Sequence, residues 1–173
     1  NHTSGLAYGL TPGPVDTIFR NAQLYDARRT LTEFTDSLAA IPLLFQPGTQ
    51  WSYSSGFDVA GRVIEVVSGQ TLDRFLDDAI FRPLGMRDTG FRIRPAMRGR
   101  LATVYTPASD GVLQPIGSDG LMAMFEPDAR FLWASGGLLS TPDDYLRFAE
   151  MLRNGGALGD VRILRPETLA LMT

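Results

Sequence analysis

Residues 46–69 of the chain, QPGTQWSYSSGFDVAGRVIEVVSG, contain the pattern that most constrains the fold. A Pro-Gly turn leads to Trp51 and Tyr53, and Ser54 and Ser55 then precede an apolar period typical of an amphipathic helix. Serine is favoured at helix N-caps, so these two serines are expected to cap the helix. Aromatic rings and hydroxyls gathered at the start of a helix indicate either a solvated capping loop or the rim of a catalytic site.

Helical patterns also account for much of the remaining chain. The expected helices cover residues 15–21, 31–41 behind a capping box at 30–33, 57–67, 72–80 with a stop at Pro83, and 142–153, and a last one begins at 166. Their expected inward faces include Phe57, Ala60, Val63, Ile64 and Val67 in one helix and Tyr145, Leu146, Phe148, Ala149 and Leu152 in another. Short β-like runs are expected at 91–93 and 101–105, with a hairpin at 157–164. The sequence therefore predicts a mainly α segment with long loops and short hairpins.

Composition excludes several classes of function. The chain has 173 residues, a net charge of −3 and a pI near 5.1, which gives no electrostatic argument for binding nucleic acid or an anionic membrane. No apolar run approaches the roughly 18 to 20 residues needed to span a bilayer. The absence of cysteine leaves the compartment undecided, with the cytoplasm favoured over the periplasm.

The residue types that are missing constrain the chemistry further. All 16 basic residues are arginine, there is no lysine, and His2 is the single histidine. A Ser-Lys pair therefore cannot be built from this chain, and a Ser-His-Asp triad could use only His2. A metal site with two imidazoles is excluded, and the spacing of carboxylates does not predict one made of acids alone. Neither a metal nor a cofactor is expected.

Tyr53 admits two interpretations from its local sequence. A tyrosine beside a tryptophan ahead of a helix is usually a half-buried packing residue whose hydroxyl bonds a neighbour. Alternatively, the hydroxyl serves an acyl centre as a general base or acid; because a phenol has a reference pKa of about 10, this role needs a nearby cation. No lysine in the chain can supply it. His2, without an identifiable partner, is expected to be a hydrogen-bonded structural residue.

Paired glycines follow Trp133 and Ser135. Gly136 and Gly137 either let a ligand approach the backbone closely or form a plain turn. The segment is not a phosphate loop, because it lacks the lysine and the strand-loop-helix spacing. Of the acidic pairs, Asp77-Asp78 is expected on a solvated surface and Asp143-Asp144 in a first helical turn, where the helix dipole favours acids.

Four segments, in chain order, resemble the serine hydrolases related to class C β-lactamases. They are NHTSGL at 1–6, the stretch at 46–91 with its Trp-x-Tyr-Ser and Pro-Leu-Gly-Met sequences, ASGGLLSTPDDYLRFAEMLRNGG at 134–156, and LRPETLALM at 164–172. The likeness covers nearly the whole chain and implies the β-lactamase/transpeptidase-like fold, an α/β fold. Residues 1–173 are then a single segment, the largely helical middle of such a domain, truncated at both ends, with the antiparallel sheet supplied by the rest of the chain.

The resemblance also implies catalytic roles. Tyr53 matches the tyrosine of the family's Tyr-x-Asn-like motif, so it is expected to act as general base to a Ser-x-x-Lys pair upstream of residue 1, whose lysine supplies the missing cation. A further Lys-Thr-Gly-like or His-x-Gly-like motif is expected downstream. Ser55 stands where the family has the Asn that helps to bind β-lactam amides. This difference favours a carboxylesterase of the family VIII type over a β-lactamase.

The implied substrate is a small-molecule ester or lactam. Residues expected to contact it are Trp51, Ser55, Phe125, Trp133, Ser135, Gly136 and Gly137. Acyltransferases on the same scaffold, and a non-catalytic relative that recognises penicillin or peptides, remain open alternatives. The segment by itself is expected to be inactive, and its partners include the rest of its own chain if that is present as separate fragments.

Overall fold

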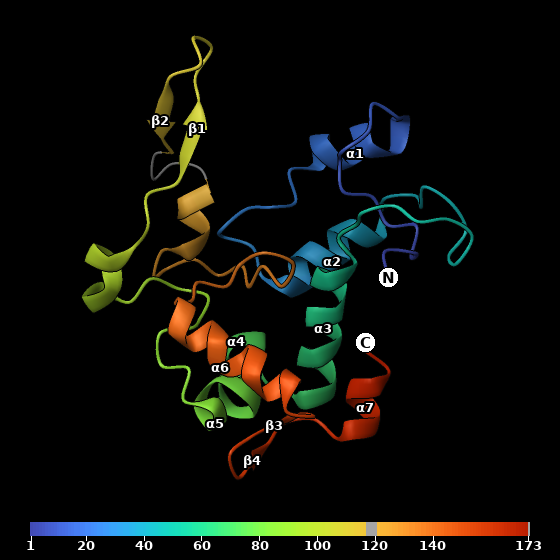
Figure 1. Cartoon of the computed structure of the whole chain (residues 1–173). Coiled ribbons are helices and arrows are strands. Elements are labelled where there is room, and N and C mark those ends of the chain that lie inside the picture. The colour runs from blue at the N-terminus through green and yellow to red at the C-terminus, as the bar shows by residue number, and fades with distance from the viewer. Residues whose placement is uncertain (117–120, 173) are drawn as a thin grey trace.

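A computed structural model describes residues 1–116 and 121–172, and it is mainly helical (Figure 1). The helices are α1 (Pro14–Ala22), α2 (Leu31–Ala39), α3 (Gly56–Ser68), α4 (Leu72–Leu76), a π-helical turn η1 (Asp77–Phe81), α5 (Arg82–Leu84), the 3-10 turns η2 (Pro95–Arg100) and η3 (Leu121–Phe125), α6 (Pro142–Arg153) and α7 (Pro166–Ala170). The strands are β1 (Tyr105–Pro107), β2 (Leu113–Pro115), β3 (Ala157–Leu158) and β4 (Val161–Arg162). The expectation of a helical segment with short hairpins is confirmed.

Both sheets are two-stranded antiparallel hairpins. In the first, Thr106 pairs with Gln114, and this hairpin projects away from the helices in Figure 1. In the second, Leu158 pairs with Val161, as expected for the run at 157–164. The run at 91–93 is not a strand, because only its neighbour Gly90 forms an isolated bridge, with Leu139. The run at 101–105 is also wrong as a strand, since pairing begins at its last residue.

Two apolar clusters hold the helices together. The main one joins the N-terminal loops to α2, to the start of α4 and to the segment after 130; its buried members are Ala7, Phe19, Leu24, Leu31, Phe34, Leu38, Ile41, Leu72, Phe91, Phe131 and Leu132. The second lies where α5 meets α6 and contains Phe81, Leu84, Met86 and Met151. Burying a side chain of this size contributes about 1.5–3 kcal/mol. Helix α3 contacts both α2 and α4, and its residues Val59 and Ile64 pack against the main cluster.

Local signals place several helix ends correctly. The Thr30 hydroxyl accepts from the N–H of Glu33 at 3.2 Å, and a Glu33 carboxylate oxygen accepts from the N–H of Thr30 at 2.7 Å, which completes the capping box. Gly69 ends α3 with a φ of 69°, a left-handed conformation that glycine adopts without a Cβ penalty. The Thr141 hydroxyl caps α6 by accepting from Asp144 at 3.2 Å. These motifs depend only on near neighbours, which is why the sequence predicts them.

The inward face of α3 differs from the predicted one. Asp58 and Gly61 are buried, whereas Phe57, Val63 and Val67 are more than half exposed. Ser55 occupies the N-cap position but its side chain makes no capping bond. Of the expected inward residues, Ile64 does pack against the main cluster. The prediction was wrong for Phe57, Val63 and Val67, because a hydrogen-bonded acid and a glycine occupy the buried face instead.

Two further helices also depart from expectation. The third helix does not stop at Pro83 but continues to Leu84 through the π turn, in which the N–H of Arg82 bonds the carbonyl of Asp77. A π turn shifts the hydrogen-bond register, so a proline just beyond it removes no needed donor. In α6, Tyr145 and Leu146 are exposed.

Asp143 and Asp144 lie in the first turn of α6, as expected. Asp144 also makes contacts beyond this turn. Its side chain is buried, and Oδ2 accepts from the N–H of Asp88 at 2.7 Å and from the hydroxyl of Thr89 at 2.9 Å. The acid therefore anchors the loop after α5 to the start of α6.

Candidate functional site

Tyr53 lies in the extended connection that precedes α3, and the N-terminal segment runs beside this connection. Three backbone hydrogen bonds join the two: the N–H of Leu44 to the carbonyl of Gly5 (2.7 Å), Gly48 to Thr3 (2.8 Å) and Ser52 to His2 (2.9 Å). The N–H of Ser54 also donates to Nδ1 of His2 at 3.2 Å. Residues 1–6 and the residues around Tyr53, which are far apart in the sequence, therefore form one unit.

The Tyr53 ring is held between two other rings. The imidazole of His2 stacks on it with a centroid distance of 4.5 Å and an interplanar angle of 29°, and Tyr8 meets it edge-on at 5.0 Å and 88°. The side chain is 39% exposed, and its hydroxyl forms no hydrogen bond with any residue that the structure describes. Among the described residues, the phenol is thus oriented by ring packing.

The aromatic contacts continue from Tyr53 to Trp133. Tyr8 contacts Tyr25 at 5.6 Å between centroids, and Tyr25 contacts Trp133 at the same distance. Trp133 is half-buried against the main core, and its Nε1–H is buried without a hydrogen-bond partner among the described residues. The structure therefore brings two of the expected site residues, Tyr53 and Trp133, into one network through two tyrosines.

A buried carboxylate lies on the same network. Asp58, on the inner face of α3, accepts from the hydroxyl of Tyr25 at 2.9 Å and from the N–H and hydroxyl of Ser135 at 3.0 and 2.9 Å. Burying a carboxylate is costly unless donors surround it, and these three bonds offset that cost. Gly61, one turn further on, lets the segment approach, because a Cβ there would lie 2.8 Å from the Cβ of Ala134. Asp58 thus ties the loop at 133–137 to the helix that follows Tyr53.

Burial determines the protonation of this network. It raises the pKa of Asp58, against the opposing effect of the hydrogen bonds from Ser135 and Tyr25. It also raises the pKa of Tyr25, with further contributions from the charge of Asp58 and from Tyr8, and it raises the pKa of Tyr8. Tyr8 and Tyr25 therefore remain neutral phenols at neutral pH. Of the three clustered tyrosines, these two are unsuited to act as a base.

The other expected residues lie in different surroundings. Trp51 is 67% exposed and touches only the edge of the His2 ring, at 5.9 Å, so it stands at the rim. Ser55 is fully buried, and its hydroxyl donates to the carbonyl of Ala7 at 3.0 Å, which gives it a role in holding the N-terminal segment. Phe125 is also buried, and it lines a separate cavity rather than the surroundings of Tyr53.

The paired glycines form a tight turn over Trp133. The N–H of Gly137 bonds the carbonyl of Trp133 at 2.6 Å, and a Cβ at Gly137 would lie only 2.5 Å from that oxygen. A Cβ at Gly136 would meet the indole ring at 3.2 Å. The turn accounts for both glycines and exposes Gly136, while Gly137 is buried.

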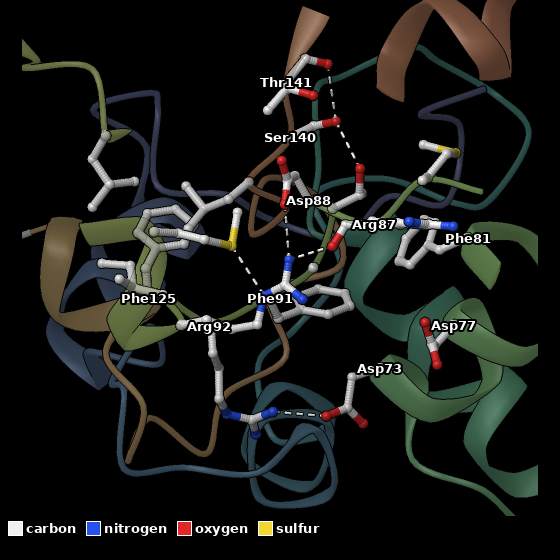
Figure 2. A pocket seen from close by; sticks show the side chains of 18 of the residues that line it. Asp73, Asp77, Phe81, Arg87, Asp88, Phe91, Arg92, Phe125, Ser140 and Thr141 are labelled. Carbon is white, nitrogen blue, oxygen red and sulfur yellow. Dashed lines mark hydrogen bonds and ion pairs between the residues drawn. The ribbon is translucent and has the colours of Figure 1, made fainter. Parts of the chain in front are cut away.

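A cavity of about 1230 Å³ lies apart from Tyr53, between the α4–α5 region and the segments near 90 and 140 (Figure 2). Figure 2 shows Arg92 reaching Asp73, and this pair is 2.7 Å apart. Asp88 pairs with Arg94 at 3.2 Å and with Arg100 at 2.7 Å. We call this space the arginine cavity, defined by these three arginines and two aspartates. None of the residues around Tyr53 lines it.

Sequence reasoning missed four residues of the site. His2 was expected to be structural and does hold a hydrogen bond, but it also stacks on Tyr53. Tyr8, Tyr25 and Asp58 were not singled out. An acid three residues before a helical glycine, both on one face, is the one local signal for Asp58, whereas nothing local marks the tyrosines because their partners are distant in sequence.

Within residues 1–116 and 121–172, no three His, Asp or Glu side chains gather as a metal-binding group. Nor does any helix of the described ranges have the length and apolar character required to cross a membrane.

The chain is similar to known proteins in both sequence and fold. Residues 1–173 match the family described as Beta-lactamase. The chain is 35% identical to Protein Rv1367c of Mycobacterium tuberculosis (strain ATCC 25618 / H37Rv) over 99% of its own length and 41% of that protein. It is 35% identical to Esterase EstB of Burkholderia gladioli over 98% of its length and 45% of the esterase. The solved structure of EstCE1, a hydrolase with promiscuous acyltransferase activity, superposes with a TM-score of 0.81 at 29% identity, covering 99% of this chain and 48% of that one.

The chain thus spans less than half the length of these relatives. The match over every residue confirms the resemblance seen in the four segments and the fold it implied. The chain belongs to the Beta-lactamase family, among hydrolases that include esterases.

Proposed function

We propose that these residues form part of a serine hydrolase that cleaves carboxylic esters through an acyl-enzyme, with Tyr53 as general base. The observation that carries the proposal is that Tyr53 is partly exposed and that its hydroxyl has no hydrogen-bond partner among the described residues. The neighbouring phenols, Tyr8 and Tyr25, have raised pKa values and are less suited to the task. The chain contains no lysine, so a Ser-x-x-Lys pair must come from residues outside these 173.

The proposed reaction is acyl transfer in two steps. The serine hydroxyl attacks the ester carbonyl and gives its proton to the Tyr53 phenolate, which the adjacent lysine stabilises. The tetrahedral intermediate collapses, the C–O bond to the alcohol breaks, and Tyr53 protonates the departing alkoxide. Water then attacks the acyl-enzyme with Tyr53 as base, and the acid leaves as the serine recovers its proton. Backbone amides outside these residues would hold the oxyanion.

Two groups of residues are proposed to border the substrate. Trp51 would form an exposed rim on one side of Tyr53, and Trp133 with the turn at 135–137 would form the other wall. Trp133 is connected to Tyr53 through ring contacts, and Ser135 is fixed by Asp58. Phe125 and Ser55, expected earlier as substrate contacts, are left out of this wall because of their burial and partners.

Acyl transfer to an alcohol is the second candidate function. The structural neighbour EstCE1 is described as a hydrolase with promiscuous acyltransferase activity, which supports the same acyl-enzyme being resolved by an alcohol instead of water. Lactam hydrolysis has less support. The position that would carry a lactam-binding Asn is Ser55, whose hydroxyl is engaged with Ala7.

The test is turnover by the full protein that contains these residues. We expect hydrolysis of p-nitrophenyl butyrate, a transferred acyl group when a primary alcohol is added, and little turnover of a chromogenic cephalosporin. A preference for the cephalosporin would contradict the esterase assignment. Absence of turnover of any of these compounds, together with no labelling by a fluorophosphonate, would favour a non-catalytic binding protein.

A further inference from the structure

We propose that His2 is a positioning residue that holds the Tyr53 phenol in its reactive orientation; this inference rests on the proposed function of Tyr53. The Tyr53 hydroxyl has no hydrogen-bond partner in the described part of the chain, so within this part ring packing sets the direction of its oxygen. One face of the ring is covered by the His2 imidazole at 4.5 Å, and Tyr8 meets the ring edge-on. Offset-stacked and edge-to-face pairs are the favoured aromatic arrangements.

The imidazole is itself fixed from several sides. Nδ1 accepts from the N–H of Ser54 at 3.2 Å, and the ring edge-contacts Trp51 at 5.9 Å and Phe57 at 5.3 Å. The acceptor role at Nδ1 places the proton of the neutral ring on Nε2. Ser54, the donor, is buried, and the hydrogen bond itself is partly buried. His2 therefore links the backbone just before α3 to the face of the Tyr53 ring.

The backbone at His2 adds a third observation. Its φ is 57°, in the left-handed region that few residues other than glycine adopt, although histidine and asparagine are enriched there. Such a conformation persists only where the surroundings stabilise it. The Ser52 N–H donates to the His2 carbonyl at 2.9 Å, and together with the Nδ1 bond this holds the residue in place.

Two substitutions separate the functions of the imidazole. His2→Asn retains an acceptor near Nδ1 and tolerates the positive φ, but it removes the ring that covers Tyr53. His2→Phe retains a ring and removes the acceptor, leaving the buried Ser54 N–H unpaired in a backbone conformation that phenylalanine disfavours. Ser4→Ala is the matched control, because it removes the 3.4 Å contact of Ser4 Oγ with Ser54 Oγ in the same segment without touching the Tyr53 ring.

The experiment measures kcat and KM for p-nitrophenyl butyrate in the full protein, with kcat normalised to active sites counted by fluorophosphonate labelling, and Tm for each variant. Misplacing a catalytic group by about 1 Å can cost on the order of 100-fold, so we expect His2→Asn to lower the normalised kcat by about tenfold or more, with KM nearly unchanged. His2→Phe should stay within about threefold of the wild-type kcat and lose Tm instead. Ser4→Ala should keep its normalised kcat.

A normalised kcat for His2→Asn within about threefold of wild type would overturn the inference, as would equal losses in His2→Asn and His2→Phe. Both results require a wild-type protein that turns over the ester. A wild-type protein that neither hydrolyses the ester nor takes the label refutes the proposed function instead, so the two failures are distinguishable.

Discussion

The surroundings of Tyr53 and the arginine cavity differ in how their polar groups are paired. In the arginine cavity, partly exposed charged side chains pair with one another, as Arg92 does with Asp73 in Figure 2. Arg100 likewise pairs with Asp88. Around Tyr53 the carboxylate of Asp58 is buried among neutral donors, and a partly exposed hydroxyl has no partner among the described residues. The arginine cavity is lined by paired charges, whereas the Tyr53 hydroxyl has no partner among the described residues and is the proposed general base.

We therefore propose Tyr53 and not the arginine cavity as the site of chemistry, although the cavity has a volume of about 1230 Å³. Side chains whose charges neutralise each other have little capacity left for a substrate, and exposed pairs contribute little to stability. A phenol packed against two aromatic rings has lost orientational freedom before a substrate arrives. Substitutions in the two regions should therefore separate effects on catalysis from effects on stability.

The largest expected effect is on Tyr53. Tyr53→Phe removes the proposed general base while preserving the ring contacts with His2 and Tyr8, so we expect kcat for ester hydrolysis to fall by about 10²–10⁴-fold. Tm should change little, because the hydroxyl bonds no described residue. Tyr105→Phe, on the exposed hairpin, is the matched control and should leave kcat unchanged. If Tyr53→Phe were as active as the wild type, Tyr53 would not be the general base.

The next effect concerns the turn that covers Trp133. Gly137→Ala places a Cβ 2.5 Å from the carbonyl oxygen of Trp133 and 2.8 Å from its Cβ, and relieving this overlap should cost about 1–3 kcal/mol of stability. Gly99→Ala is the control, since no atom lies within 4 Å of a Cβ there. Urea unfolding measures both. Similar midpoints would show that the turn is looser than described.

A smaller effect should appear in the pH dependence of stability. Burial raises the folded pKa of Asp58 above its unfolded value of about 3.9, so its contribution to stability is fully present below that pH and is lost as pH rises toward the folded pKa. Asp58→Asn removes the ionisable group, so the stability of the variant should fall less with rising pH than that of the wild type. Urea unfolding midpoints measured from about pH 3.5 to 7 test this. If the stability of the wild type instead rose with pH relative to the variant, the folded pKa of Asp58 would lie below its unfolded value, contrary to our expectation.

The smallest effect is expected in the arginine cavity. Asp88→Asn breaks its pairs with Arg94 and Arg100, all of which are at least 30% exposed, and should cost about 1 kcal/mol or less. Its kcat should equal that of the wild type, because no residue around Tyr53 lines the cavity. A loss of kcat comparable to that of Tyr53→Phe would move the candidate site to this cavity.

Sequence reasoning succeeded where structure depends on near neighbours. The capping box at Thr30 and Glu33, the glycine end of α3 and the cap at Thr141 each involve residues within a few positions, and all are present. The aromatic and hydroxyl pattern before α3 also marked Tyr53 as a candidate. These signals need no knowledge of the tertiary fold.

The remaining features depend on partners that sequence spacing does not reveal. Asp58 is buried because Tyr25 and Ser135, which lie 33 and 77 residues away, donate to it, and this reversed the expected inner face of α3. Likewise, His2 was assigned a structural role because its contact with Tyr53 joins segments about 50 residues apart. The π turn before Pro83 was not predicted either, because no local pattern marked it; its last residue, Phe81, is buried with Met151 of α6, 70 positions away.

The most direct test of the central claim is to locate the reactive serine. The full protein and its Tyr53→Phe variant would be treated with a fluorophosphonate, and the labelled peptide identified by mass spectrometry. Our account predicts a single labelled serine outside residues 1–173, followed by lysine three positions on, with slower labelling in the variant. A label on a serine within these residues, or equal labelling rates in the two proteins, would contradict the role of Tyr53.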